Sequence, residues 1–247
     1  MTFPVIDPEK DALFLDLDGT MIDIAPHPDD VVAPRRLIEC LARLNEQLSG
    51  AVAIISGRPI AAIDALLAPL LLPAAGVHGA EIRFEQGQKS VHRVAPAIPS
   101  GVRWLLAPLA NVPGVVIEDK TVAIAVHFRQ APAAAERVRE IVELAVGAHE
   151  TDELTIVPGK CVYEIKHARF SKGTAVAEFM ERPPWTGRRP VFVGDDVTDE
   201  AAFAVLPKWH GKGLAVGEDR PGARARFKSA AEVRHWLASL VGQECTT

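Results

Sequence analysis

The feature that most constrains the fold is a short apolar run that ends abruptly in acidic residues. Residues 12–15 are continuously apolar, which is typical of a strand covered on both faces of a sheet. The carboxylates Asp16 and Asp18 follow directly, and Gly19 and Thr20 come next. Open α/β sheets bind ligands at the carboxyl ends of their strands, so this junction predicts both a strand and a site.

The segments that follow alternate between helix and strand. Apolar side chains recur at helical spacing over 37–48, a second buried strand is predicted over 52–55, and Pro59 suits the start of the next helix. This alternation predicts a parallel sheet wrapped by helices. It resumes near the end of the chain with a helix over 172–180, a strand over 190–193, a helix over 199–205, a strand over 213–216 and a final helix reaching Trp236.

Between these two stretches the pattern changes to hairpins. Pairs of apolar runs flank turn signals at 86–88, 118–120 and 158–159, and a helix is predicted over 132–146. Hairpins imply antiparallel pairing, so we expect an α+β insert of ordinary domain size. The predicted organisation is an α/β core formed by residues 1–85 and 168–247, with residues 86–167 inserted.

Charge and cysteine content narrow the classes of function. The chain has 32 acidic and 27 basic side chains and a net charge of −5, which disfavours a protein that coats nucleic acid or an anionic membrane. Cys40, Cys161 and Cys245 form no CxxC pair, which fits neither a disulfide framework nor a zinc knuckle. With no signal peptide or membrane span predicted, we expect a cytoplasmic monomer that binds a small molecule. The basic residues of 221–228 are expected to form a solvated surface.

A second acidic cluster changes the interpretation of the first. Gly194 precedes Asp195, Asp196, Asp199 and Glu200, just after another apolar strand. So many carboxylates at one place would repel one another unless a cation lay among them, and oxygen-only ligands indicate Mg²⁺. An alternative role for Asp196 and Glu200 is that of a helix cap and a first-turn acid.

Four motifs follow one another in order along nearly the whole chain. They are Asp16-Leu17-Asp18-Gly19-Thr20, Ser56-Gly57-Arg58, Lys172-Gly173 and Gly194-Asp195-Asp196-Val197-Thr198-Asp199-Glu200. This ordered set resembles that of the haloacid-dehalogenase superfamily of phosphotransferases, and the insert resembles the larger cap domain of the superfamily's sugar phosphatases. The implied fold is a Rossmann-like parallel-sheet core with an inserted α+β cap.

The resemblance implies Mg²⁺-dependent phosphoryl transfer through an aspartyl phosphate. Asp16 would attack phosphorus, while Asp18 would protonate the leaving alcohol and then activate water. Mg²⁺ would be held by Asp16, the backbone carbonyl of Asp18 and Asp195, with Asp199 orienting its ligands. The phosphoryl oxygens would be held by Ser56, Gly57 and Lys172.

Several alternatives stay open. Ser56 has an alternative role as the cap of the helix at Pro59, and Lys172 as a solvated helix residue. The implied acid and base, Asp18, is a feature of the superfamily's phosphatases and mutases. The competing functions are therefore another sugar phosphatase, a phosphohexomutase, and, from a different class, a non-catalytic sugar-phosphate sensor.

Three further local patterns lie in or beside the insert. They are Gly76-Val77-His78-Gly79-Ala80-Glu81, Val126-His127-Phe128-Arg129 and Pro158-Gly159-Lys160-Cys161-Val162-Tyr163-Glu164-Ile165-Lys166. These patterns resemble those of trehalose-6-phosphate phosphatases, which implies that trehalose 6-phosphate is the substrate, in trehalose biosynthesis. The resemblance assigns binding of the sugar remote from the phosphate to Lys160 and Glu164, and we add Arg58, His127 and Arg129 to this set.

Strand periodicity gives these insert residues a common face. With a period of two, Lys160, Glu164 and Lys166 fall on one side of a strand, as His127 and Arg129 do on another. Such a face can present cations and anions to a polyol. The alternative is an exposed polar face with cross-strand charge pairs and no ligand.

Overall fold

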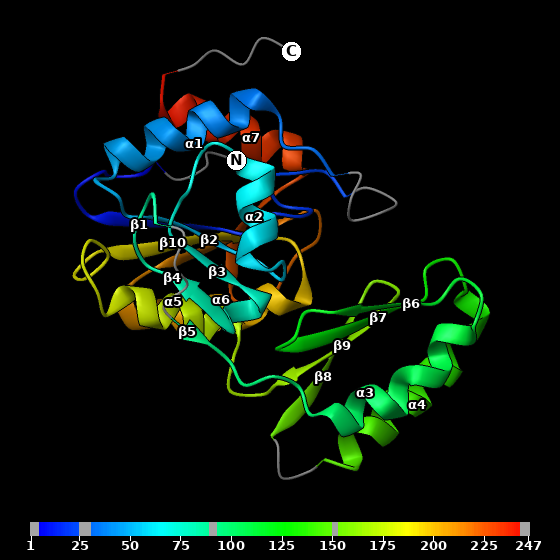
Figure 1. Cartoon of the computed structure of the whole chain (residues 1–247). Coiled ribbons are helices and arrows are strands. Elements are labelled where there is room, and N and C mark those ends of the chain that lie inside the picture. Colours follow the sequence, from blue (N-terminus) through cyan, green and yellow to red (C-terminus); the bar gives the residue numbers. More distant parts are fainter. Residues whose placement is uncertain (1–4, 25–30, 89–92, 150–152, 243–247) are drawn as a thin grey trace. The chain divides into compact units, whose positions relative to one another are not determined.

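The computed structural model describes residues 5–24, 31–88, 93–149 and 153–242, and it divides the chain into two compact units (Figure 1). The core unit comprises residues 1–92 and 171–247, and the insert unit comprises residues 93–170. The sequence analysis places these two divisions a few residues earlier, after residues 85 and 167.

One sheet of eight strands forms the centre of the core unit. The strands are β1 (Asp11–Leu15), β2 (Val52–Ile55), β3 (Ala74–Gly76), β4 (Glu81–Arg83), β5 (Arg93–Val94), β10 (Arg189–Gly194), β11 (Lys212–Val216) and β12 (Ala223–Phe227). Their order is β12-β11-β10-β1-β2-β3-β4-β5, parallel from β12 to β3 and antiparallel between β3 and β4. Because both faces are covered, β1 and β2 are buried along their whole length.

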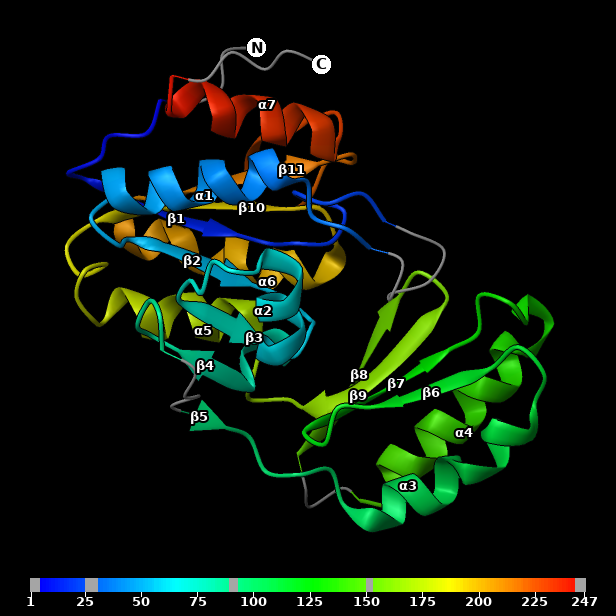
Figure 2. The ribbon, with the colours of Figure 1, turned by 45° about the horizontal axis from the view of Figure 1, so that its top comes forward.

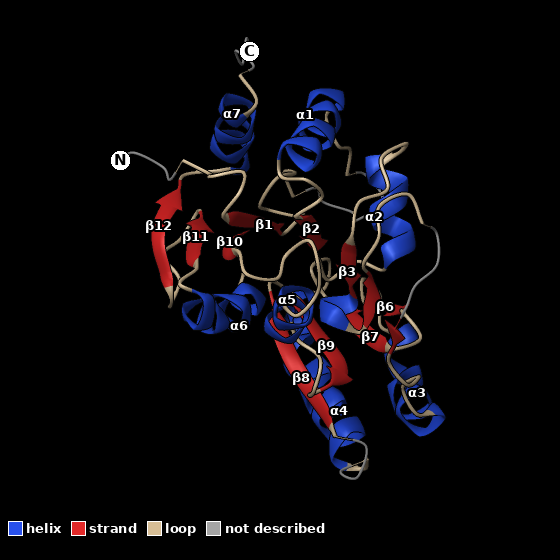
Figure 3. Cartoon of the chain, turned by 90° about the vertical axis from the view of Figure 1, so that its left-hand side faces the viewer, coloured by secondary structure: helices blue, strands red, loops and turns tan. Residues whose placement is uncertain are grey.

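Helices cover both faces of this sheet. On one face lie α1 (Arg35–Gln47), α2 (Ile60–Leu67) and α7 (Ala230–Leu240), and on the other lie α5 (Lys172–Met180) and α6 (Val197–Val205), as Figures 2 and 3 show. Helix α1 buries Leu37, Leu41 and Leu44, one face of a helical repeat. Short 3₁₀ helices, Val77–Gly79 and Leu206–Trp209, follow β3 and α6.

The insert unit is an antiparallel sheet with helices on one face. Its strands, in the order β6-β7-β9-β8, are β6 (Val116–Asp119), β7 (Ala123–His127), β9 (Val162–His167) and β8 (Leu154–Gly159). Helices α3 (Ser100–Leu106) and α4 (Ala135–Gly147) bury Val102 and Val142 in one cluster with Val126 and Ile165 of the sheet. Alternate strand residues therefore point to the face without helices. Ala107–Asn111 and Pro132–Ala134 are 3₁₀ turns.

Three elements, β3, α3 and β12, were not predicted. Helix α3 has only seven residues, so it shows little of a helical repeat, and prolines at 99 and 108 flank it. In β12 the exposed Arg224 and Arg226 alternate with the partly buried Ala223 and Ala225. The stretch predicted as a solvated surface is therefore an edge strand with one solvated face.

The hairpins also differ in detail from the prediction. Strand β8 continues through Pro158 to Gly159, and the turn consists of Lys160 and Cys161, where Cys161 has a φ of +64°. Proline is tolerated because β8 is an edge strand. Lys160 thus lies in a turn and does not share the strand face of Glu164 and Lys166. The first predicted hairpin supplies β4 to the core sheet, and its residues 89–92 lie outside the described residues.

The cysteines and the helix lengths bear on the disulfide-rich and membrane classes of protein considered in the sequence. Cys40 and Cys161 form no disulfide bond with each other or with another described residue, and Cys245 lies outside the described residues. Within the ranges that the structure describes, none of the helices has the length and apolar character needed to cross a membrane.

Candidate active site

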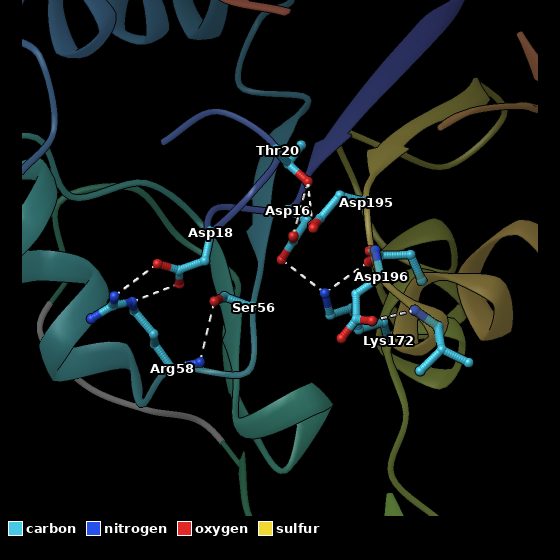
Figure 4. Close-up of polar contacts among 10 residues, drawn as sticks. Asp16, Asp18, Thr20, Ser56, Arg58, Lys172, Asp195 and Asp196 are labelled. Atoms are coloured by element: carbon cyan, nitrogen blue, oxygen red, sulfur yellow. Dashed lines mark hydrogen bonds and ion pairs between the residues drawn. The ribbon is translucent and has the colours of Figure 1, made fainter. Parts of the chain in front are cut away.

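The carboxyl ends of β1 and β10 bring the two acidic motifs together. Asp16 follows β1, its backbone N–H donates to the carbonyl of Val193 at 3.0 Å, and its side chain is buried. Asp195 follows β10, and Figure 4 shows its carboxylate beside that of Asp16. Carboxylate oxygens of Asp16, Asp195 and Asp199 lie within 4.8 Å of one another. The structure thus joins Asp16 and Asp195, which are 179 positions apart in the sequence (195 − 16).

Gly19 and Thr20 fit closely against these carboxylates. A Cβ at Gly19, whose φ is +77°, would lie 2.2 Å from an oxygen of Asp195, so the loop requires glycine here. The hydroxyl of the buried Thr20 is 3.0 Å from Asp16 Oδ2 and 3.1 Å from Asp195 Oδ1. A hydroxyl donates one proton and therefore satisfies one carboxylate at a time.

Lys172 supplies the positive charge of this cluster. It begins α5, whose N-cap Ser171 forms a reciprocal capping box with Thr174. Its Nζ donates to Asp16 at 2.8 Å and to Asp199 at 2.7 Å. Burial lowers the pKa of Lys172, but the charges of Asp16 and Asp199 outweigh burial and hold that pKa above its usual range. The alternative interpretation of Lys172 as a solvated residue is wrong.

The carboxylates outnumber the ammonium group. Burial, and then repulsion from Asp16 and Asp199, raises the pKa of Asp195 to about 8. Burial likewise raises the pKa of Asp199 to about 7, although Lys172 opposes the shift. When all three carboxylates are ionised, the single lysine leaves two negative charges uncompensated. This oxygen donor set fits a divalent cation such as Mg²⁺.

Asp196 and Asp199 together cap α6. The Asp196 side chain accepts the N–H of Val197 at 2.7 Å, and Asp199 accepts the N–H of Asp196 at 2.9 Å. The helix-cap interpretation of Asp196 is confirmed, and Glu200 lies in the first turn of α6. Asp199 has one oxygen on Lys172 and the other on this cap, which suits a residue that orients its neighbours.

Asp18 is paired with Arg58, on the other side of the loop (Figure 4). The Nε of Arg58 donates to Oδ2 of Asp18 at 2.6 Å, and Nη2 donates to Oδ1 at 2.7 Å. Such a fork fixes the orientation of a carboxylate. Arg58, predicted to contact the sugar, therefore engages the predicted acid and base.

Ser56 begins the loop between β2 and α2. Its backbone donates to Ala75 at 2.9 Å and accepts from His78 at 2.9 Å. The Ser56 hydroxyl accepts the N–H of Arg58 at 3.2 Å, and Pro59 occupies the N-cap position of α2. The alternative interpretation of Ser56 as the cap of that helix is wrong.

The segment after β3 shapes this loop, a role that its sequence pattern did not reveal. Val77 and His78 have φ values of +47° and +54°, which are strained for residues other than glycine. A Cβ at Gly57 would lie 2.8 Å from the His78 ring, so glycine lets the imidazole approach the loop. Glu81 accepts the N–H of Ile60 at 2.8 Å, at the start of α2.

A separate polar group lies on the helix-free face of the insert sheet. Lys120 Nζ donates to Glu164 at 2.8 Å, and His127 Nε2 lies 3.0 Å from Glu118. The contact with His127 lowers the pKa of Glu118, although burial opposes the shift. The register pairs Glu118 with Ala125 and Ala125 with Glu164, so this face crosses three strands.

Glu118 and Lys120 were not predicted as site residues, because residues 118–120 were interpreted only as a hairpin turn, whereas Glu118 lies in β6. Of the predicted residues, Lys160 and Arg129 are exposed beyond strand ends. Lys166 is buried and donates to the carbonyl of Phe170, and burial lowers its pKa against the charge of Glu164. The alternative interpretation, an exposed polar face without a ligand, therefore does not describe Lys166.

Comparisons with known proteins agree over most of the chain. A family model described as trehalose-phosphatase matches residues 14–226. The trehalose-6-phosphate phosphatase of Escherichia coli (strain K12) is 39% identical over 97% of this chain and 91% of that protein. A probable trehalose-phosphate phosphatase of Sinorhizobium fredii is 40% identical over 93% of this chain and 87% of its own length.

Solved structures give the same fold. The C-terminal domain of the trehalose-6-phosphate phosphatase of C. albicans superposes with a TM-score of 0.84, covering 96% of this chain and 93% of that one at 21% identity. A phosphatase of the haloalkanoate (HAD) superfamily from Bacteroides thetaiotaomicron covers 98% of both chains with a TM-score of 0.62 at 17% identity. With the family match spanning both units, the chain belongs to the trehalose-phosphatase family.

Proposed function

We propose that the protein hydrolyses trehalose 6-phosphate to trehalose and inorganic phosphate, with Mg²⁺ as its cofactor. The observation that carries this proposal is the buried cluster in which Lys172 and Thr20 hold Asp16 beside Asp195 and Asp199. The names of the relatives support the substrate, since the Escherichia coli protein is a trehalose-6-phosphate phosphatase.

Asp16 acts as the nucleophile in this proposal. A bond forms between its carboxylate oxygen and phosphorus, and the bond between phosphorus and the sugar oxygen breaks. Asp18 gives a proton to that oxygen, and trehalose leaves. Water then attacks the phosphorus of the aspartyl phosphate, Asp18 takes up its proton, and release of phosphate restores Asp16. The fork from Arg58 supports an orienting role for Arg58 toward Asp18.

Mg²⁺ would be held by Asp16, Asp195 and the backbone carbonyl of Asp18, with Asp199 orienting these ligands. When bound, it would offset the negative charge that the phosphoryl group adds to the carboxylates. The two uncompensated charges of the cluster support this role.

Ser56, Gly57 and Lys172 are proposed to hold the phosphoryl oxygens. An ammonium group has three N–H donors, and two of those on Lys172 are directed at Asp16 and Asp199. Among the described residues the third has no hydrogen-bond acceptor assigned to it, so it is available to a phosphoryl oxygen. Ser56 offers a hydroxyl beside the loop N–H groups.

The insert unit is proposed to bind the sugar remote from the phosphate. His127, Arg129, Lys160 and Glu164 are the predicted residues, and Glu118 and Lys120 join them through the contacts described above. Charged donors and acceptors held on a rigid sheet suit the many hydroxyls of a disaccharide.

The proposal is tested by measuring phosphate release from a panel of phosphosugars, with Mg²⁺ and with the metal chelated. We expect trehalose 6-phosphate to be hydrolysed with the highest kcat/KM, and chelation to abolish turnover. Lys160→Ala should raise KM for this substrate, and Lys208→Ala, on the surface of the core unit, is the matched control.

Each competing function has its own outcome in this panel. Equal rates with glucose 6-phosphate would indicate a broader sugar phosphatase. Isomerisation that needs a sugar bisphosphate would indicate a mutase, and binding without turnover would indicate a sensor. The proposal also includes a cytoplasmic, monomeric state, which sedimentation of the purified protein and fractionation of cells would test.

A further inference from the structure

An arginine in the loop after β11 contacts the main chain of the acidic cluster. The loop, residues 217–222, leaves the carboxyl end of β11, which neighbours β10 in the sheet (Figure 3). It carries Arg220, whose side chain is 21% exposed. The Nε of Arg220 donates to the backbone carbonyl of Asp195 at 3.0 Å. A hydrogen bond from a charged donor is stronger than one between neutral groups.

The same guanidinium links the loop to α6. Its Nη1 is 3.7 Å from Glu200, in the first turn of α6, and its Nη2 is 3.4 Å from Glu218, within the loop. Arg220 thus connects three segments that meet at the carboxyl edge of the sheet. Its charge also lies close to a cluster with an excess of carboxylates.

Hydrogen bonds therefore restrain both the side chain and the main chain of Asp195. Its carboxylate contacts the hydroxyl of Thr20, and its carbonyl accepts from Arg220. When ionised, it is repelled by Asp16 and Asp199, so an unrestrained residue would move away from them. A fixed main chain keeps the Asp195 carboxylate where three oxygen ligands converge.

A second arginine provides an internal comparison. Arg226, on β12, donates to the carbonyl of Gly217 at 2.5 Å and pairs with Asp219 at 3.0 Å. Arg220 and Arg226 both anchor the same loop. Of these two described residues, Arg220 is the one that contacts Asp195. Comparing a variant of Arg220 with a variant of Arg226 therefore separates the effect of anchoring the loop from the effect of positioning Asp195.

We propose that Arg220 is a positioning residue for the metal site and that it acts by holding the peptide of Asp195. This inference rests on the proposed function, in which Asp195 is a Mg²⁺ ligand. Groups that orient metal ligands without touching the metal typically contribute about 10- to 100-fold to metal affinity. Arg220 lies in none of the four sequence motifs, and its role follows from the contacts in the structure.

The test is calorimetric titration of Mg²⁺ into the purified full-length protein and its variants. We expect Arg220→Gln to raise the Kd for Mg²⁺ by about tenfold, within the range for residues behind a metal ligand. Arg220→Lys, which keeps the charge without the planar fork, should give a smaller increase. Arg226→Gln should leave the Kd within about twofold. At saturating Mg²⁺, the kcat and the KM for the phosphosugar should return to those of the unmodified protein.

Some results would overturn the inference. Equal weakening by Arg220→Gln and Arg226→Gln would mean that the loop only needs anchoring, and an unchanged Kd in Arg220→Gln would remove the role altogether. If the unmodified protein bound no Mg²⁺, the proposed cofactor would fail instead, which is a distinguishable result.

A further variant keeps the test decisive should Arg220→Gln fail to fold. Glu200→Gln removes an ion-pair partner of Arg220 and leaves its donation to Asp195 in place. We expect its Mg²⁺ Kd to stay within about twofold of the unmodified protein, whereas Arg220→Lys weakens binding. If Glu200→Gln weakened Mg²⁺ binding and Arg220→Lys did not, the ion pair with Glu200 would matter and the contact with Asp195 would not.

Discussion

The core and insert units hold their charged residues in different ways. In the core unit, Lys172 and its partner Asp199 are almost fully buried, at 4% and 0% side-chain exposure. In the insert unit, Lys120 and Glu164 lie on one face of a sheet at 11% and 9% exposure. Buried charges persist only where every group has a partner. The charged groups of the core unit are therefore fixed in one arrangement, whereas the more exposed pairs of the insert face are the ones that the proposed sugar would replace.

The largest expected effect comes from the core nucleophile. Asp16→Asn keeps the shape of the side chain and removes the attacking oxygen anion, so activity should fall by at least about 10³-fold. Phosphate release measures the loss, and circular dichroism checks the fold. Asp23→Asn, at an exposed ion pair with Arg234, is the control and should retain activity. An active Asp16→Asn variant would contradict the mechanism.

Loss of the core lysine should destabilise the fold. Lys172→Met leaves Asp16 and Asp199 buried without their cation, and breaking a buried pair in this way costs about 3–5 kcal/mol. Lys120→Met breaks the less buried insert pair and should cost about 1–2 kcal/mol. Urea unfolding measures both losses, with the exposed Lys212→Met as control. Equal losses in the two units would mean that burial does not distinguish them.

Substitution in the insert unit should act on binding and leave the chemistry intact. Glu164→Gln removes one charged acceptor, so KM for trehalose 6-phosphate should rise by about 10-fold or more. Hydrolysis of p-nitrophenyl phosphate, which has no sugar, should change by less than about twofold. Glu140→Gln, exposed on α4, is the matched control. A parallel loss with both substrates would place Glu164 outside the proposed sugar site.

The same contrast explains how much of the molecule could be predicted from the sequence. Asp16 and Asp195 each follow an apolar strand, and the carboxyl ends of parallel strands lie at one edge of a sheet, so the pattern predicted both acidic motifs at that edge. That β1 and β10 are neighbours, which joins the motifs into one cluster, is seen in the structure. The fork from Arg58 to Asp18 could not be predicted in this way, because strand periodicity gives no direction for a loop side chain. The short motif resembled a phosphatase loop but did not specify what Arg58 contacts.

The polar contacts of the insert unit were harder to predict than those of the core unit, because the sequence pattern constrains the positions of its polar side chains less. Glu118 and Lys120 belong to the predicted hairpin turn 118–120, and charged residues are common in turns for reasons unrelated to ligands. Lys166 has the right alternation, but its side chain reaches the carbonyl of Phe170 instead of the exposed face. Helix α3 is too short for its apolar spacing to stand out. Alternation assigns a face to a residue, but the partners available at the strand ends decide where a long side chain goes.

The smallest expected effect is a pH-dependent stabilisation by Mg²⁺. The pKa of Asp195 is raised to about 8 and that of Asp199 to about 7 in the folded protein, against 3.8 for a free aspartate. A raised pKa favours the protonated carboxyl in the folded state. These two groups therefore stabilise the metal-free fold fully below about pH 4, and that contribution is lost as the pH rises through 7 and 8.

Mg²⁺ should reverse this loss, because it binds the ionised carboxylates and competes with their protons. At pH 8 we expect millimolar Mg²⁺ to raise the Tm by about 5 °C, and at pH 5 by less than about 2 °C. Thermal unfolding at equal ionic strength, with NaCl as the control, measures both shifts. Asp195→Asn should abolish most of the difference between the two pH values. An equal rise at pH 5 and pH 8 would mean that Mg²⁺ acts outside the core cluster, since protons on Asp195 and Asp199 would then not compete with it.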